Sequence, residues 1–173
     1  MTLESGTVVI RRAVAADVPR LHVLISGFAD RDRMLHRSLN ELYENLRDFR
    51  VADRDGEVVG CCALHVFWAD LAEVKSLAVA EGRQGGGIGR RLVEACVADA
   101  AALGIPRVFC LTYEADFFRR CGFHVVDRCR FPRKVWSECV RCPKFFDCTE
   151  IAMTREVAVA GAGPAAEEAV AAG

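Results

Sequence analysis

The sequence has no uninterrupted apolar stretch of the roughly 18–20 residues that a membrane-spanning helix requires. Residues 1–12 also lack the basic segment followed by an apolar segment that is typical of a secretory signal peptide. The nine cysteines are an odd number, and their density is below that of secreted, disulfide-rich domains. We therefore expect a cytoplasmic protein with reduced thiols and no membrane association.

The sequence also has almost no net charge, because 23 Lys and Arg stand against 24 Asp and Glu, which leaves −1 at pH 7. This balance argues against a general nucleic-acid-binding protein, which attracts phosphates through an excess of basic residues. With 173 residues, 52% of them hydrophobic and 27% charged, the chain can bury the core of about one domain. We expect that domain over residues 1–157, followed by a disordered tail rich in Ala and Gly over 158–173.

The spacing of apolar residues predicts an α/β fold with a mixed sheet. Helices are expected from Asp17 to Phe28, from Leu39 to Leu46, from the glycines near 87 to Gly104, and at 114–121. Strands are expected at 7–12, 48–53, 57–68, 71–79, 107–112 and 123–126. The nearly continuous apolar run within 57–68 is typical of a strand that is covered on both faces.

A glycine-rich loop, residues 84–89 (QGGGIG), stands between an expected strand and an expected helix. Glycines let backbone amides approach a ligand closely, and a helix start adds unpaired N–H groups, so phosphate is the expected ligand. The loop lacks the Gly-Lys-Ser/Thr ending of a Walker loop, the third glycine of a dinucleotide fingerprint, and the two flanking strands of a kinase loop. A glycine-rich turn that binds no ligand is the alternative.

The loop does match the pattern Gln-x-x-Gly-x-Gly, after a strand that ends in Leu-Ala-Val at 77–79. With this pattern and the segment Phe117–Phe123 (FFRRCGF), the chain resembles the GNAT superfamily of acyl-CoA N-acyltransferases over roughly residues 7–155. The resemblance implies a single GNAT-like domain with a mixed, mostly antiparallel sheet, splayed central strands and flanking helices. It also implies acetyl-CoA as cosubstrate, with contacts from Leu77, Val79, Gln84, Gly85, Gly87, Ile88, Gly89 and Arg90.

Acyl transfer from a thioester to an amine requires a proton acceptor for the amine, donors for the oxyanion and departure of the thiolate. The resemblance implies that Glu73, at the start of the splayed strand, accepts the proton directly or through water. A solvated glutamate at a strand end is the alternative. Many relatives carry a tyrosine that acts as a general acid at the position where this chain has Phe118. Tyr113 is therefore expected either to replace that general acid or to shape the acceptor pocket.

Within the superfamily the chain is similar to the short, stand-alone bacterial N-acetylglutamate synthases, over stretches that include residues 34–46, 59–68 and 133–153. This likeness implies L-glutamate as the acceptor, in the first step of arginine biosynthesis. Guanidinium groups suit its two carboxylates. The expected acceptor-binding residues are Arg37, Lys75, Thr112, Lys134 and Arg141.

For each of these cations a solvated surface charge is the alternative. Three other functions also remain open: acetylation of another small amine, acetylation of a protein amino group, and acyl-CoA binding without catalysis. A homodimer is left open too.

The cysteines near the C-terminus have the spacing Cys-x2-Cys-x5-Cys, whose opening pair is typical of zinc sites. We expect a structural zinc on Cys139, Cys142 and Cys148, with a fourth ligand from Cys129, His124 or Cys121. Because a second ligand pair is missing, cysteines packed as small apolar residues are the alternative. Four other cysteines are expected in the core: Cys61, Cys62, Cys96 and Cys110.

Overall fold

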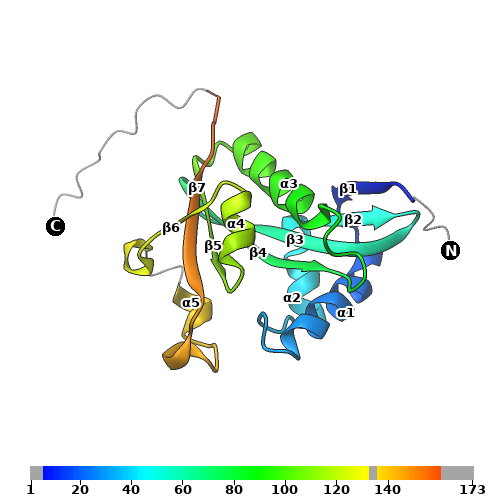
Figure 1. Cartoon of the computed structure of the whole chain (residues 1–173), viewed down its shortest axis with the longest axis horizontal. Helices are drawn as coiled ribbons and strands as arrows, with labels where there is room; N and C mark the ends of the chain where they lie inside the picture. Colours follow the sequence, from blue (N-terminus) through cyan, green and yellow to red (C-terminus); the bar gives the residue numbers. More distant parts are fainter. Residues whose placement is uncertain (1–5, 133–135, 161–173) are drawn as a thin grey trace.

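The computed structural model describes residues 6–132 and 136–160, which form a seven-stranded mixed sheet with helices on both faces (Figure 1). The strand order is β1-β2-β3-β4-β5-β7-β6, with β4 and β5 parallel and every other neighbouring pair antiparallel. The strands are β1 (Val8–Arg12), β2 (Phe49–Arg54), β3 (Glu57–Trp68), β4 (Leu71–Val79), β5 (Arg107–Thr112), β6 (His124–Val125) and β7 (Ile151–Glu156).

Five α-helices connect these strands, together with short 3-10 turns. The helices are α1 (Val18–Ala29), α2 (Leu39–Glu44), α3 (Ile88–Ala102), α4 (Ala115–Arg120) and α5 (Trp136–Cys139). The 3-10 turns are η1 (Ala15–Asp17), η2 (Leu46–Asp48), η3 (Arg128–Arg130) and η5 (Phe145–Asp147). No helix in the described part of the chain combines the length and the apolar character needed to cross a bilayer.

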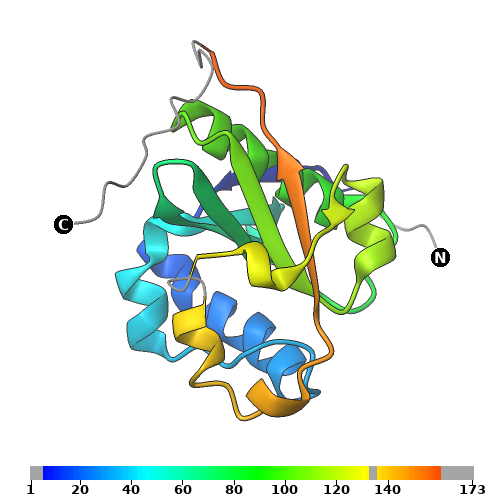
Figure 2. The same ribbon diagram turned by 90° about the vertical axis from the view of Figure 1, so that its left-hand side faces the viewer.

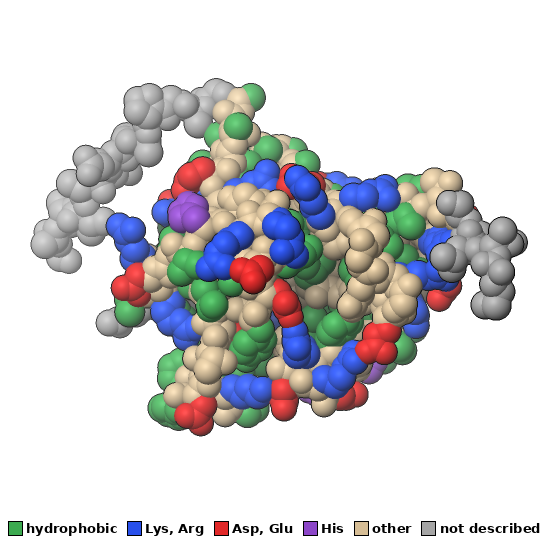
Figure 3. All heavy atoms as spheres, viewed as in Figure 1, with side chains coloured by type: hydrophobic (Ala, Val, Ile, Leu, Met, Phe, Trp, Pro, Cys, Tyr) green, Lys and Arg blue, Asp and Glu red, His purple; other side chains and the backbone are tan. Residues whose placement is uncertain are grey.

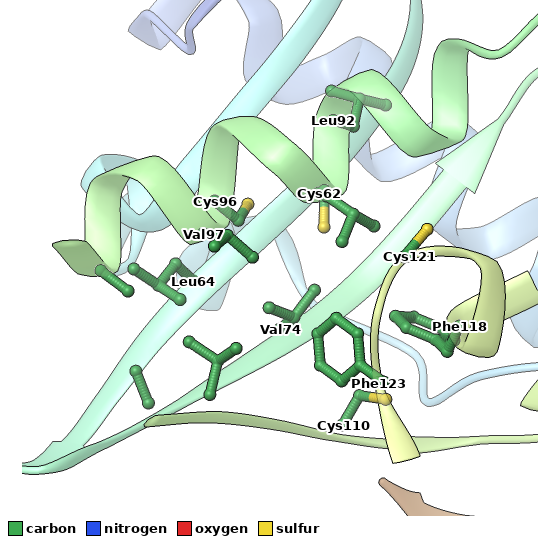
Figure 4. Packing of buried hydrophobic residues seen from close by; sticks show 14 of the residues in the cluster. Cys62, Leu64, Val74, Leu92, Cys96, Val97, Cys110, Phe118, Cys121 and Phe123 are labelled. Carbon is green, nitrogen blue, oxygen red and sulfur yellow. The ribbon is translucent and has the colours of Figure 1, made fainter. Parts of the chain in front are cut away.

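The core has one layer on each face of the sheet, because alternate residues of a strand point to opposite faces. On one face, α3 packs with Leu92, Cys96 and Val97 against the strand residues Cys62 and Leu64 (Figure 4). On the other face, α1 and α2 pack against a second set of buried residues that includes Val51, Cys61 and Ala63. The four cysteines expected in the core are all buried, which confirms that prediction.

Most predicted elements are confirmed, and the two central strands β4 and β5 have the predicted bounds. Helix α3 begins at Ile88, within the glycine loop, and ends before Gly104, whose φ of +73° favours glycine. Strand β7, which lies between β5 and β6 in the sheet, was not expected from the sequence. Its sequence, IAMTRE, is short and partly polar, so it carries little periodic signal; its position depends on pairing with β5, which is distant in sequence.

The separation of β4 from β5 shapes the centre of the sheet. The parallel register between them consists of Ala72 opposite Val108 and Glu73 opposite Phe109. A bulge in β4 follows, where the register with β3 shifts and Ser76 takes a φ of +52°. The later residues of both strands, among them Leu77 and Thr112, therefore border a cavity.

An ion-pair network joins β1 and β2 to the start of α1. The Arg11 guanidinium donates hydrogen bonds of 2.7 and 3.0 Å to Asp17 and one of 2.9 Å to Asp53. Asp17 also accepts a 2.8 Å hydrogen bond from the Val14 amide, and its side chain is only 9% exposed. The hydrogen bonds from Arg11 hold the pKa of Asp17 below its usual value.

This network predicts a pH-dependent contribution to stability. Because the pKa of Asp17 is lower in the folded than in the unfolded chain, its contribution is complete above the unfolded value of 3.8 and is lost as the pH falls through the folded value. Asp17→Asn should lower the free energy of unfolding by roughly 1–3 kcal/mol at pH 7, and this difference should shrink below about pH 4. Urea unfolding at several pH values measures it.

The matched control is Asp116→Asn, which removes an exposed ion pair with Arg119 within α4. This change should alter stability by less than about 0.5 kcal/mol. Equal effects of the two substitutions at pH 7 would contradict the assignment to Asp17.

Candidate active site

A cavity of about 820 Å³ lies where β4 and β5 separate. Its walls come from the loop between α1 and α2, the glycine loop, α4 and the segment 136–150. The segment 136–150 lies beside the end of α1 (Figure 2), and Lys144 Nζ is 3.3 Å from Asp32 Oδ1. The C-terminal part of the chain thus encloses one end of the cavity.

The glycine loop forms the other end of the cavity, in front of α3. Gly85 and Gly87 have φ values of +83° and +79°, and a Cβ atom at either position would meet nothing within 4 Å. Gly87 is the N-cap residue of α3, so the first amides of this helix and its partial positive charge face open space. The Gln84 side chain donates a 3.1 Å hydrogen bond to the Val79 carbonyl, which ties the loop to the end of β4.

Two phenylalanines of α4 pack behind the glycine loop. A Cβ atom at Gly89 would lie 3.3 Å from Phe117 Cζ, so Gly89 allows α3 and α4 to approach closely. Phe118 is buried and makes edge-to-face contacts with Phe117 and Phe123. Phe118 is therefore a core residue, and its ring supplies no proton donor to the cavity.

Basic side chains surround the glycine end of the cavity. Arg83, Arg90 and Arg120, from the loop, α3 and α4, all border it. Figure 3 shows Lys and Arg side chains gathered on the face that carries α4 and the glycine loop. With the N-terminus of α3, these charges make this end of the cavity suitable for a polyanionic group such as a pyrophosphate.

A carboxylate and an ammonium group lie together on β4, deeper in the cavity. Glu73 Oε2 is 3.9 Å from Lys75 Nζ, and the two side chains are only 12% and 15% exposed. Both border the cavity, and Glu73 belongs to the last registered pair between β4 and β5. The point at which the strands separate therefore carries a shielded carboxylate.

The end of β5 contributes Thr112 and Tyr113. The Thr112 hydroxyl accepts a 2.8 Å hydrogen bond from the Glu114 amide, which fixes the turn after the strand. Tyr113 borders the cavity, and burial together with the nearby charge of Glu150 raises the pKa of its phenol. The phenol is therefore protonated at neutral pH and able to donate a proton or a hydrogen bond.

Comparison with known proteins identifies the family. A profile of the acetyltransferase (GNAT) domain matches residues 45–125. An uncharacterized N-acetyltransferase of Chlorobaculum tepidum, CT2212, is 42% identical over 146 residues, which cover 84% of this chain and 94% of that protein. The chain belongs to the GNAT acetyltransferases. The amino-acid acetyltransferase of Mycobacterium tuberculosis is 39% identical over 136 residues, 77% of this chain and 78% of that protein.

Solved structures of GNAT proteins share the fold. The N-acetylglutamate synthase of Neisseria gonorrhoeae, solved with coenzyme A and N-acetyl-glutamate, aligns with a TM-score of 0.81 at 28% identity. That match covers 90% of this chain but 36% of the longer synthase. Rv2747 of Mycobacterium tuberculosis, solved in a complex that contains CoA, aligns with a TM-score of 0.75 at 34% identity over 87% of this chain and 99% of that one. The predicted GNAT-like architecture is thereby confirmed.

The structure places most of the predicted site residues of this GNAT domain around one cavity. The lining includes Glu73, Tyr113, Arg37, Lys75, Thr112, Leu77, Val79, Gln84, Gly85, Gly87, Ile88, Gly89 and Arg90. Arg37 directly precedes α2, whose N-cap is Ser38. Arg141 is exposed and is not among the lining residues, and Lys134 lies outside the described residues.

The prediction of a structural zinc site is not supported. Among residues 6–132 and 136–160, no group of three or more His, Cys, Asp or Glu side chains is placed to hold a metal ion. Cys139, Cys142 and Cys148 border the cavity as free thiols. Burial and the nearby charge of Glu73 raise the pKa of Cys139 to about 11, so its thiol is neutral at physiological pH.

Several residues of the cavity wall were not predicted from the sequence to lie there. Glu150, just before β7, borders the cavity, and burial raises the pKa of its carboxyl. Cys148 Sγ lies 3.6 Å from Glu150 Oε2 and donates to it. Lys144, Arg128 and Trp136 border the same space. These residues belong to no recognisable motif, and they reach the cavity because the described segments 128–132 and 136–150 lie against it before β7 begins.

Proposed function

We propose that this GNAT domain transfers the acetyl group of acetyl-CoA to the α-amine of L-glutamate, the first step of arginine biosynthesis. The observation that carries the proposal is a single cavity with a basic, glycine-lined end and, at the strand separation, the shielded Glu73–Lys75 pair. The proposal is supported by relatives named amino-acid acetyltransferase and by the likeness to a synthase solved with coenzyme A and N-acetyl-glutamate. Cytoplasmic location, the domain limit at residue 157 and a homodimer stay predictions.

In this proposal the glycine end of the cavity holds the coenzyme. The amides of Gly85, Gly87, Ile88 and Gly89 face the pyrophosphate, because nothing within 4 Å fills the space at Gly85 and Gly87. Arg90 adds positive charge, and Gln84 keeps the loop in place through Val79. The backbone of Leu77 and Val79, beyond the registered part of β4, pairs with the pantetheine arm.

The amine nitrogen attacks the thioester carbonyl carbon, and the carbon–sulfur bond then breaks. Glu73 takes a proton from the ammonium group, directly or through water, which gives the nitrogen its lone pair. A backbone N–H near Leu77 or Val79 stabilises the oxyanion. Tyr113, which is protonated at neutral pH, donates a proton to the leaving thiolate, and the second proton that the nitrogen loses as the amide forms restores the Tyr113 hydroxyl.

The acceptor's two carboxylates are assigned to cations that border the cavity. Arg37 and Lys75 lie on different walls, one before α2 and one on β4, so each can take a different carboxylate. Thr112 fixes the end of β5 nearby. Lys134 and Arg141 remain proposed contributors from the C-terminal segment, and Arg141 would have to turn inward from its exposed position.

Coenzyme binding should depend on open space at the glycine loop. Gly87→Val should raise the dissociation constant for acetyl-CoA by at least about ten-fold, because a side chain enters the anion site and the φ of +79° disfavours it. Isothermal titration calorimetry measures the affinity. The control is Gly27→Ala in α1, where an added Cβ also meets nothing within 4 Å. Unchanged affinity of a folded Gly87→Val protein would exclude this site.

Glu73→Gln should lower kcat by on the order of 10²–10⁴, because the amide cannot accept the amine proton at neutral pH. The affinity for acetyl-CoA should change little, since Glu73 lies away from the glycine loop. Release of free thiol from acetyl-CoA measures turnover between pH 6 and 9. A variant with near-normal turnover across this range would remove Glu73 from the mechanism.

Acceptor choice is tested by the same thiol-release assay across the twenty amino acids. L-Glutamate should be the best acceptor, and glutamine a poor but measurable one. Arg37→Ala should raise the KM for glutamate by about ten-fold or more and leave that for acetyl-CoA unchanged, because a carboxylate loses its partner. Arg47→Ala, at an exposed position outside the cavity lining, is the control. If lysine or a basic peptide is the best acceptor, the glutamate assignment is wrong.

A further inference from the structure

The acetyl transfer releases a proton that must leave a nearly closed site. An ammonium group loses two protons when it becomes an amide N–H. The coenzyme thiolate takes up one of them, and the other passes to the solvent in every turnover. Glu73 receives a proton in the proposed function, yet its side chain is only 12% exposed and borders the cavity that both substrates fill. The proton therefore needs a route other than the cavity.

The sheet places a histidine next to Glu73 on the side away from the cavity. His65 of β3 is directly opposite Glu73 in the antiparallel register, so the two side chains extend from the same face of the sheet. Directly opposed Cβ atoms are about 4.5–5.5 Å apart, within reach of one bridging water. His65 is not among the cavity-lining residues, and its side chain is 34% exposed.

A carboxylate fixes the form of this histidine. Asp48, at the end of η2, has its Oδ2 atom 2.7 Å from His65 Nδ1. An ionised carboxylate only accepts hydrogen bonds, so His65 Nδ1 carries the hydrogen and donates it to Asp48. When Nδ1 carries the only ring hydrogen, the Nε2 atom has a lone pair that can accept a proton. The Phe67 ring holds the imidazole in an edge-to-face contact at 5.2 Å.

Among the residues that the structure describes, the other ionisable groups that border this part of the cavity are less suitable as proton acceptors. Lys75 is assigned in the proposed function to a carboxylate of the acceptor, and Cys139 remains a neutral thiol with a pKa of about 11. Glu150 borders the cavity itself, so the bound substrates shield it from solvent too. On the other side of Glu73, the β5 neighbour is the apolar ring of Phe109.

We propose that His65, oriented by Asp48, takes the proton from Glu73 and passes it to the solvent. This proposal rests on the proposed role of Glu73. The proton on the Glu73 carboxyl moves through a bridging water to His65 Nε2, which restores the carboxylate, and the exposed imidazolium then loses a proton to bulk water or buffer. His65 is a positioning and relay residue and touches neither substrate.

The test is a kinetic comparison of three variants. His65→Ala should lower kcat at pH 7 by on the order of ten-fold with unchanged KM values, less than the loss expected for Glu73→Gln. Added imidazole, which fits the vacated space, should restore most of the turnover. Asp48→Asn should also lower kcat, because an amide that donates to Nδ1 reverses the tautomer, and imidazole should not restore it since the ring still fills the space. His124→Ala, on the exposed strand β6, is the matched control and should show neither effect.

A folded His65→Ala protein with normal kcat, or with a loss that imidazole does not restore at any pH, would overturn the relay. If His65→Ala does not fold, His65→Gln replaces it, with the pH dependence of kcat as the readout: a profile identical to that of the wild type would contradict the proposal. Glu73→Gln, assayed in parallel, separates the two hypotheses. A slow Glu73→Gln with an unaffected His65→Ala refutes only the relay, whereas an active Glu73→Gln refutes the proposed base and the relay with it.

Discussion

The short parallel pairing of β4 with β5 is the constraint on which the rest of the site depends. Neighbouring strands normally stay within hydrogen-bonding distance along their length. Here the registered pairs end at Glu73 and Phe109, and the bulge at Ser76 turns β4 away from its neighbour. Backbone groups of β4 beyond that point face a cavity instead of another strand. The same separation leaves room for α4 and the segment 136–150 to form the remaining walls.

The separation also fixes the electrostatics of the site. Because Glu73 lies in the last registered pair, its carboxylate is held by a sheet on one side and opens to the cavity on the other. Lys75, two residues along the same face of β4, compensates its charge at 3.9 Å. At the far end, the N-terminus of α3 and three arginines create a positive region. A single cavity thus has distinct places for an anionic group and for an amine.

The sequence correctly predicted those features of the fold that depend on the local pattern of apolar and turn residues. The bounds of β4 and β5, the start of α3 in the glycines and the buried cysteines of β3 follow from periodicity and turn residues over short distances. The C-terminal segment could not be predicted in this way. β7 is placed by pairing with β5, and Glu150 borders the cavity because it directly precedes this strand. The spacing of Cys139, Cys142 and Cys148 suggested zinc, but spacing alone does not show how side chains are arranged in space. The three free cysteines line the cavity wall instead.

The separation of the strands also bears on the proposed proton donor, since Phe118 stands where the resemblance led us to expect a tyrosine. Phe118 belongs to the packed cluster with Phe117 and Phe123 and also borders the cavity, but its ring carries no hydroxyl. Tyr113 extends from the end of β5, whereas Glu73 lies on β4. The proposed proton donor and proton acceptor are thus on the two strands that diverge. For a thioester held between these strands, the leaving sulfur would receive its proton from one wall of the cavity. The attacking amine would give its proton to the opposite wall, so the two proton transfers would take place at separate points.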